Sequence, residues 1–244
     1  MTLLFEDRFD TLDEARWLPY YLPQWSSRAA TATRYTVGDG LKLRIDAGQA
    51  PWCPEFDGDI KATVLQTGVF SGPVGSGLGQ CHFREDLVVR EAQENRRLFT
   101  PTYGRFEMRA KALDHPRFMV ALWMIGYEDE PHRSGEICVA EIFGKNVRGD
   151  SAGIGMGLHP FNDPGIRDEF EVVDVPIDAR EFHVYAAEWR PGNVRFFVDG
   201  EQVKVVDQAP DYPMQFMLGM YEFPGAEPAT YPQEFAVDWI RAYD

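Results

Sequence analysis

The segment 135–144, Gly-Glu-Ile-Cys-Val-Ala-Glu-Ile-Phe-Gly, holds the most chemically informative pair of side chains in this 244-residue chain. Glu136 and Glu141 would point to opposite faces of a regular strand, because the side-chain period is two. One extra residue in a β-bulge shifts this phase, so that Glu136, Cys138 and Glu141 share a face. Two carboxyl groups side by side are what retaining glycoside hydrolysis needs, one to attack the sugar and one to transfer protons. Without a bulge, the alternative is two surface glutamates on an edge strand.

The elements that would position this pair are β-strands. Residues 104–111 alternate apolar and charged side chains, which predicts a half-buried antiparallel strand. Asp199-Gly200 lies between two β-rich runs within 194–206 and predicts a two-residue hairpin turn. We expect further strands at 40–46, 62–67, 118–126, 136–143, 153–159, 182–189, 214–221 and 234–243.

Helical periodicity is almost absent, and only 11–17 and 84–93 are expected to supply a helical turn or two. Many strands separated by turns, without alternating helices, favour a β-sandwich or jelly roll over a parallel α/β sheet. The glycine-rich stretch 68–79 is too short to separate domains, and no internal repeat is visible. The sequence therefore predicts an all-β fold in a single domain, 1–244.

The composition excludes several classes of partner. The chain has 24 Lys and Arg against 39 Asp and Glu, a formal net charge of −15, which repels phosphate backbones and anionic membrane surfaces. No apolar stretch approaches the roughly 20 residues that a membrane helix needs. We therefore expect neither nucleic acid nor membrane as a partner. Aromatic residues make up 14% of the chain and leave open a neutral partner with flat faces on which to stack.

Two further features bear on the cellular compartment. The first residues have no basic start and no apolar core of signal-peptide length, which predicts a cytoplasmic protein, or a secreted one if a leader has been removed. Cys53, Cys81 and Cys138 have no metal-binding spacing and cannot all pair. Free thiols are favoured over a Cys53–Cys81 disulfide.

Several segments together resemble glycoside hydrolase family 16. Residues 135–144 resemble the active-site strand of its laminarinase-like branch, written Glu-x-Asp-x-x-Glu. Segments on both sides of this strand also resemble the family, in the family's order and along nearly the whole chain. These segments are 5–10 with Trp17, 103–111, 121–124, 157–159, 182–189, 194–200 and 235–243.

This resemblance implies a concanavalin A-like jelly roll of two curved antiparallel sheets, whose concave face binds a polysaccharide or oligosaccharide of β-glucan or galactan type. By position, Glu136 matches the nucleophile and Glu141 the acid/base of a retaining endo-glycosidase. A transglycosylase would use the same two residues. No cofactor is needed for this chemistry, and we expect a monomer.

Other positions are candidates for substrate binding. Trp123 matches an active-site aromatic of the family, although by pattern alone it reads as a core residue. His159 matches a histidine near the acid/base, with a structural histidine as the alternative. Tyr103 and Phe143 are aromatic candidates for the cleft, and for each of them packing is the alternative.

The sequence departs from the family at its motif. Cys138 stands where the family has an Asp that hydrogen-bonds the nucleophile. A thiol is a weak donor and a poor acceptor, so the coupling between the glutamates should weaken. We therefore expect a slowed or re-tuned glycosidase, and the alternative function is a lectin-like jelly roll that binds carbohydrate with weakened or lost catalysis.

The resemblance also suggests a structural calcium site at Asp7 and Asp238, on the first and last strands. Calcium prefers oxygen ligands, which an acidic side chain and backbone carbonyls would supply. Arg8, however, stands where relatives commonly carry a further acidic residue.

Overall fold

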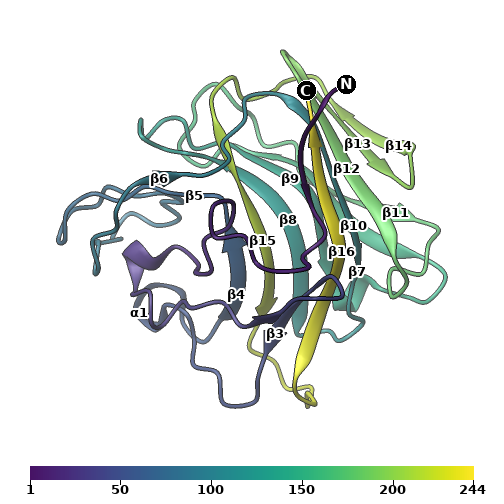
Figure 1. Ribbon diagram of the computed structural model, residues 1–244, viewed down its shortest axis with the longest axis horizontal. Helices are drawn as coiled ribbons and strands as arrows, with labels where there is room; N and C mark the ends of the chain where they lie inside the picture. Colours follow the sequence, from purple (N-terminus) through teal and green to yellow (C-terminus); the bar gives the residue numbers. More distant parts are fainter.

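The computed structural model describes residues 1–244 and consists of two antiparallel sheets packed face to face (Figure 1). The outer sheet comprises β1 (Leu3–Asp7), β2 (Tyr35–Thr36), β3 (Leu41–Ile45), β7 (Gly104–Lys111), β12 (His183–Arg190), β13 (Asn193–Val198), β14 (Glu201–Val206) and β16 (Gln233–Tyr243). The inner sheet comprises β4 (Lys61–Gln66), β8 (Phe118–Gly126), β9 (Glu136–Phe143), β10 (Ala152–His159), β11 (Glu171–Val175) and β15 (Met214–Glu222).

The strand order shows that these sheets are built from distant parts of the chain. The outer sheet runs β14-β13-β12-β7-β16-β3-β2, with β1 also paired to β16, and the inner sheet runs β11-β10-β9-β8-β15-β4. A separate two-stranded ribbon pairs β5 (Gly68–Val69) with β6 (Arg96–Arg97). This arrangement confirms the predicted all-β jelly roll. In Figure 1 the ribbon and the short helix α1 (Pro54–Asp57) lie on the side of the inner sheet away from β16 and β7.

The predicted strands are found within one residue of their expected bounds, and those predicted at 118–126 and 136–143 coincide with β8 and β9. The hairpin turn is also present: Asp199 and Gly200 have φ of 50° and 85°, and Val198 pairs with Glu201. Positive φ at both central residues is what a tight two-residue hairpin requires. Four strands were not predicted, namely β2, β5, β6 and β11.

A single helical turn is found within the predicted segment 11–17, and none is found at 84–93. The first segment makes one turn, in which the Arg16 and Trp17 N–H groups both donate to the Asp13 carbonyl at 2.9 Å. Residues 84–93 bond to distant loops instead, for example from the Val89 N–H to the Ser76 carbonyl at 2.8 Å. The helices are α1 and the two 3₁₀ turns Pro23–Trp25 and Gly144–Asn146. None of them is long and apolar enough to cross a membrane.

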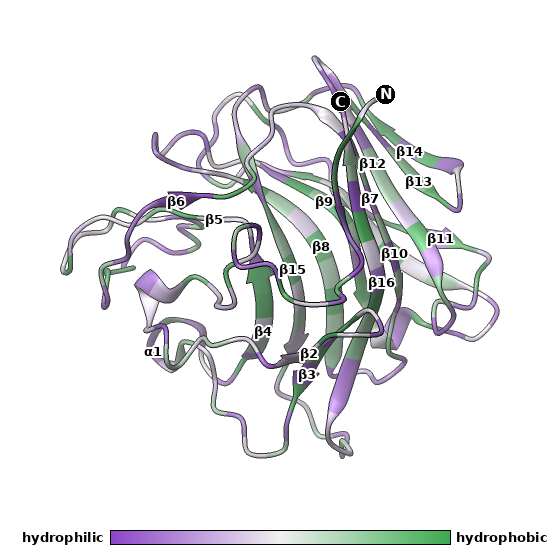
Figure 2. Cartoon of the chain, in the orientation of Figure 1, coloured by the Kyte–Doolittle hydropathy of each residue, from purple (hydrophilic) through white to green (hydrophobic).

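Strand β8 separates two hydrophobic clusters and is buried along its whole length. Phe118, Val120, Leu122 and Met124 face the main core of 42 buried residues between the sheets. The alternate residues, such as Trp123, belong to a second cluster of 18 buried residues on the other face. Figure 2 shows hydrophobic colour along β4 and much of β8, whereas hydrophilic residues recur along β7 and β16. The inner sheet is therefore covered on both faces, and loops cover the second one.

Candidate active site

Strand β9 contains the β-bulge that the spacing of the glutamates predicts. Leu122 of β8 pairs with Ala140, but the next residue, Trp123, pairs with Cys138, so Val139 is the extra residue. Both Val139 and Ala140 therefore face the main core. The alternation changes phase there, and Glu136 and Glu141 emerge on the same face of the sheet, where both line one pocket.

This pocket has a volume of about 280 Å³ and is mostly apolar. Its floor comes from β8, β9 and β15, and its walls come from loops, including the segments 47–60 and 68–100. The lining residues other than the two glutamates are Tyr21, Trp52, Asp57, Ile60, Cys81, Phe83, Met119, Trp123, Phe161, Tyr221 and Phe223. A concave apolar site with a few converging polar groups is the usual form of a small-molecule or glycan site.

The two carboxyl groups lie in a strongly desolvated environment. Glu136 is only 7% exposed, and burial raises its pKa well above the usual range, with further contributions from the charges of Glu141 and Asp168. Burial raises the pKa of Glu141 to about 7. Neither residue forms an ion pair. Two largely desolvated carboxyl groups without a cationic partner therefore retain a proton near neutral pH, because both cannot ionise at low cost.

Cys138 lies between the two glutamates but below the surface of the pocket, where it is fully buried. Its Sγ makes one weak contact, 3.9 Å from the Gly155 carbonyl oxygen. Burial, and then the charges of Glu141 and Glu136, raise the pKa of the thiol well above its ordinary value, so it stays neutral. The thiol does not hydrogen-bond to either carboxyl group.

Comparison with known proteins places this arrangement in a family. The family model for glycosyl hydrolases family 16 matches residues 90–241. The chain belongs to this family. The match includes β7 to β15 and most of β16, and with them both glutamates.

Individual members of family 16 are similar to this chain in sequence. A beta-glucanase of Rhodothermus marinus is 27% identical over 167 residues, 58% of this chain and 57% of that protein. A glucan endo-1,3-beta-glucosidase of Cryptopygus antarcticus is 30% identical over 105 residues, 41% of this chain and 37% of that protein. The chain thus spans about three fifths or less of these curated relatives.

Solved structures show the same fold. An endo-β-galactosidase from Clostridium perfringens that releases GlcNAcα1-4Gal has a TM-score of 0.85 and 28% identity, over 99% of this chain and 62% of that one. A laminarinase from a Flavobacterium species has a TM-score of 0.68 and 22% identity, over the whole of both chains.

Aromatic side chains line part of the floor and one wall of the pocket in this family 16 chain. Trp123 lies there, and its Nε1–H donates to the Tyr221 hydroxyl at 3.1 Å. The Tyr221 ring packs edge-on to Tyr21 at 5.6 Å, which in turn lies 4.6 Å from Trp52. Gly219 leaves room for this arrangement, since a Cβ there would lie 2.9 Å from the Tyr221 hydroxyl oxygen. The pocket-lining positions of Tyr21 and Phe83 were not predicted from the sequence, because both residues lie on loops without any periodic pattern.

His159 and Phe143 lie next to the pocket but do not line it. His159 pairs with Glu136 across β10 and β9. Its ring stacks on Phe170 at 4.6 Å, and its Nδ1 lies 3.3 Å from a carboxylate oxygen of Asp168. Phe143 packs at 5.5 Å against Phe223, which does line the pocket. Both are positioned to support the wall.

Tyr103 lies elsewhere. It has a left-handed backbone, with φ of 68°, and its ring packs edge-on against Trp189 at 5.1 Å. It lines a separate hollow together with Phe99 and Gly104. The turn before β7 thus directs Tyr103 away from the two glutamates.

Asp7 and Asp238 do not fit a calcium site. The carboxylate of Asp7 is buried and already accepts from the Phe9 N–H and the Trp17 Nε1–H, both at 2.8 Å. Asp238 forms an ion pair with Arg109 instead. No group of three or more His, Cys, Asp or Glu side chains in the structure could hold a metal ion.

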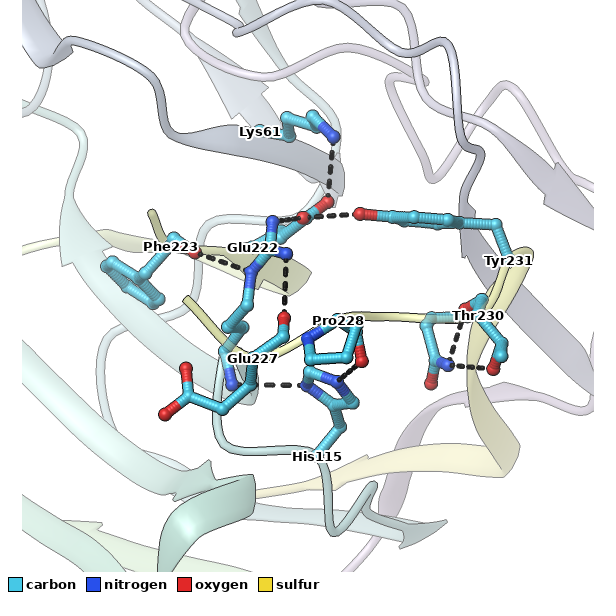
Figure 3. Close-up of polar contacts among 10 residues, drawn as sticks. Lys61, His115, Glu222, Phe223, Glu227, Pro228, Thr230 and Tyr231 are labelled. Carbon is cyan, nitrogen blue, oxygen red and sulfur yellow. Dashed lines mark hydrogen bonds and ion pairs between the residues drawn. The ribbon is translucent and has the colours of Figure 1, made fainter. Parts of the chain in front are cut away.

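Another buried glutamate, at the end of β15, is bound very differently (Figure 3). Glu222 is 1% exposed and accepts from Lys61 Nζ at 3.0 Å, from the Tyr231 hydroxyl at 2.6 Å and from Arg117. Arg117 also donates to the carbonyl of Phe223 at 3.3 Å. This Glu222 cluster thereby anchors the segment that carries Phe223 into the pocket.

Proposed function

We propose that this chain is a retaining endo-glycosidase in which Glu136 is the nucleophile and Glu141 the general acid and base. The observation that carries this proposal is the bulge at Val139, which brings both carboxyl groups onto one pocket-lining face. Their burial without any cationic partner supports it, since a retaining enzyme needs one carboxylic acid and one carboxylate.

The first step breaks the glycosidic bond. Protonated Glu141 donates its proton to the glycosidic oxygen, while a carboxylate oxygen of Glu136 forms a bond to the anomeric carbon. The positive charge that develops on the sugar ring stabilises the ionised form of Glu136. The reaction therefore requires the proton of the pair to be on Glu141, whose pKa of about 7 suits an acid that must also act as a base, and requires Glu136, whose pKa is raised further by burial, to be ionised when substrate is bound.

The second step releases the sugar from Glu136. Glu141, now ionised, takes a proton from water as the water oxygen attacks the anomeric carbon, and the bond to Glu136 breaks. The chemistry uses only these two side chains and water. Trp123 and its aromatic neighbours would hold the pyranose rings by stacking.

The proposed substrate is a neutral β-linked glycan of the glucan or galactan type. The net charge of −15 disfavours heavily sulfated or uronic polymers. The curated relatives are β-glucanases, but the endo-β-galactosidase superimposes with a TM-score of 0.85 against 0.68 for the laminarinase. That difference favours a β-galactoside.

The test has two parts. The purified chain is incubated with laminarin, lichenan, agarose and carrageenan, and new reducing ends are measured. A mechanism-based covalent glycosidase inhibitor is then applied, and the labelled residue is located by mass spectrometry. We expect turnover of a neutral glycan and a label on Glu136 that is absent from the Glu136→Gln variant. Binding of glycans with neither label nor turnover would contradict the proposal and indicate a lectin.

A further inference from the structure

A second pocket is lined by residues that follow, in the chain, residues of the first one. It has a volume of about 230 Å³, which is the scale of a single pyranose ring. Cys81 and Phe161 line the first pocket, and the residues that follow them in the chain, His82 and Asn162, line the second. The two pockets therefore lie on either side of the same two backbone segments. The complete lining of the second pocket is Gly77, Leu78, Gly79, His82, Glu128, Pro131 and Asn162.

Glu128 is the buried acid of this second pocket and has almost no partners. It is 2% exposed, forms no ion pair, and accepts one hydrogen bond, from the Cys81 N–H at 2.5 Å. Burial raises its pKa to about 8, so the carboxyl group is protonated at neutral pH. A protonated carboxyl both donates and accepts hydrogen bonds, and most of this capacity is unused within the fold.

His82 adds a second unused group. Its Nε2 is shielded from solvent and has no hydrogen-bond partner. Opposite it stands Gly77, where even a Cβ would lie 3.9 Å from that nitrogen, so no side chain covers it from this direction. A buried polar atom without a partner is costly, and a hydroxyl group bound in the pocket would remove that cost.

The backbone around the border of the two pockets is strained. Cys81, Glu128 and Phe161 have φ of 52°, 58° and 46°, a left-handed conformation that side-chain-bearing residues seldom adopt. Cys81 and Phe161 line the first pocket and Glu128 lines the second, and Cys81 donates its N–H to Glu128. Strain of this kind persists where the surrounding structure holds a functional geometry in place.

We propose that the second pocket is a sugar subsite, which binds one neutral pyranose ring of a glycan that continues from the first pocket, with Glu128 and His82 hydrogen-bonding to its hydroxyl groups. No Lys or Arg lines this pocket, which disfavours an anionic sugar. Leu78 and Pro131 supply the apolar surface that the ring's C–H face needs. The inference rests on the proposed function, because the glycan must pass Glu136 to enter both pockets.

The test compares binding of short and long glycans. Laminari-oligosaccharides and agaro-oligosaccharides of two to six sugars are titrated calorimetrically into the chain with Glu136→Gln, which binds without cleaving. In that background Glu128→Leu removes the carboxyl group, and His82→Phe keeps a ring against Trp25 but removes the nitrogens. Glu130→Gln, an exposed carboxyl on the same loop and outside the pocket, is the matched control.

We expect affinity to rise at the chain length that first reaches the second pocket. Glu128→Leu and His82→Phe should each reduce that rise about tenfold, and Glu130→Gln should not change it. If Glu128→Leu fails to fold, as its melting curve would show, His82→Phe still decides the question. If affinity rises by the same factor in all variants, the proposed subsite is wrong. It is also wrong if Glu128→Leu and His82→Phe lower the affinity equally at every chain length. Failure of the proposed function is read separately, from absence of turnover by the unmodified chain.

Discussion

Strands β15 and β9, which lie on either side of β8, each carry a buried glutamate, and the two glutamates have very different partners. Glu222 is 1% exposed and is held by Lys61, Arg117 and the Tyr231 hydroxyl. Glu136 is 7% exposed on the same sheet and has no ion pair at all. Burial is similar, so the difference between the two lies in the cations that surround them.

This difference separates a structural carboxylate from the one that we propose to be reactive. At Glu222, two cations and a hydroxyl group compensate for the lost water. Glu136 and Glu141 have only each other, so their protonation responds to pH and to the charge of a bound substrate. Absence of cationic partners is therefore the property that makes the second pair suitable for proton transfer and nucleophilic attack.

The strongest test of this comparison is to neutralise one glutamate of each kind. Glu136→Gln should lower kcat by about 10⁴-fold or more, because the amide cannot form the glycosyl-enzyme. Glu222→Gln should leave the rate of the chemical step within a few fold. Initial rates on the best glycan of the screen, with circular dichroism to confirm folding, measure both. Comparable losses in the two variants would contradict the assignment.

A pH profile tests the unpaired state of Glu141 directly. Its pKa is raised to about 7, so Glu141 holds its proton below pH 7 and loses it above. The general acid is lost as pH rises, and kcat/KM should fall about tenfold per pH unit above pH 7. With an aryl glycoside whose leaving group needs no proton, this alkaline limb should flatten. Activity that stays constant up to pH 9 on a natural glycan would rule out Glu141 as the acid.

The floor of the site could be predicted from sequence because it consists of strands. Strands at 118–126 and 136–143 were predicted and coincide with β8 and β9, and the period of two meant that Glu136 and Glu141 could share a face only if a bulge lay between them. Local rules suffice here, since each side chain's direction follows from its position along the strand.

The walls of the site could not be predicted, because non-local contacts place them. The Cys81 N–H donates to the carboxyl group of Glu128 across 47 positions of sequence. The path of the loops depends on further bonds of this kind, such as Arg90 N–H to the Gln24 carbonyl at 2.7 Å. The position of Tyr103 could not be predicted either, because its own positive φ directs its ring toward Trp189. No periodic pattern encodes such contacts.

The two variants should rank in the opposite order for stability and for activity: Glu222→Gln should be the less stable one and Glu136→Gln the less active one. Glu222→Gln leaves Lys61 and Arg117, whose side chains are only 17% and 19% exposed, without their counter-charge. We expect the free energy of unfolding to fall by about 3 kcal/mol. Glu136→Gln removes an unpaired buried acid and should leave stability unchanged or raise it. Urea denaturation of both variants at pH 7.5 measures the difference, and equal stabilities would refute the comparison.

The smallest expected effect concerns Cys138, whose neutral thiol connects neither glutamate. Cys138→Asp would add a carboxyl group able to share a proton with Glu136, which favours the ionised nucleophile and should raise kcat by up to about tenfold. The same change adds a third buried acid without a cation, so the free energy of unfolding should fall by about 1–3 kcal/mol. Cys138→Ser, which adds a hydroxyl group without a charge, is the matched control and should change kcat less. If Cys138→Asp gives no gain in hydrolysis of any β-glucan or galactan, the thiol does not limit the rate, and the unpaired glutamates are sufficient by themselves.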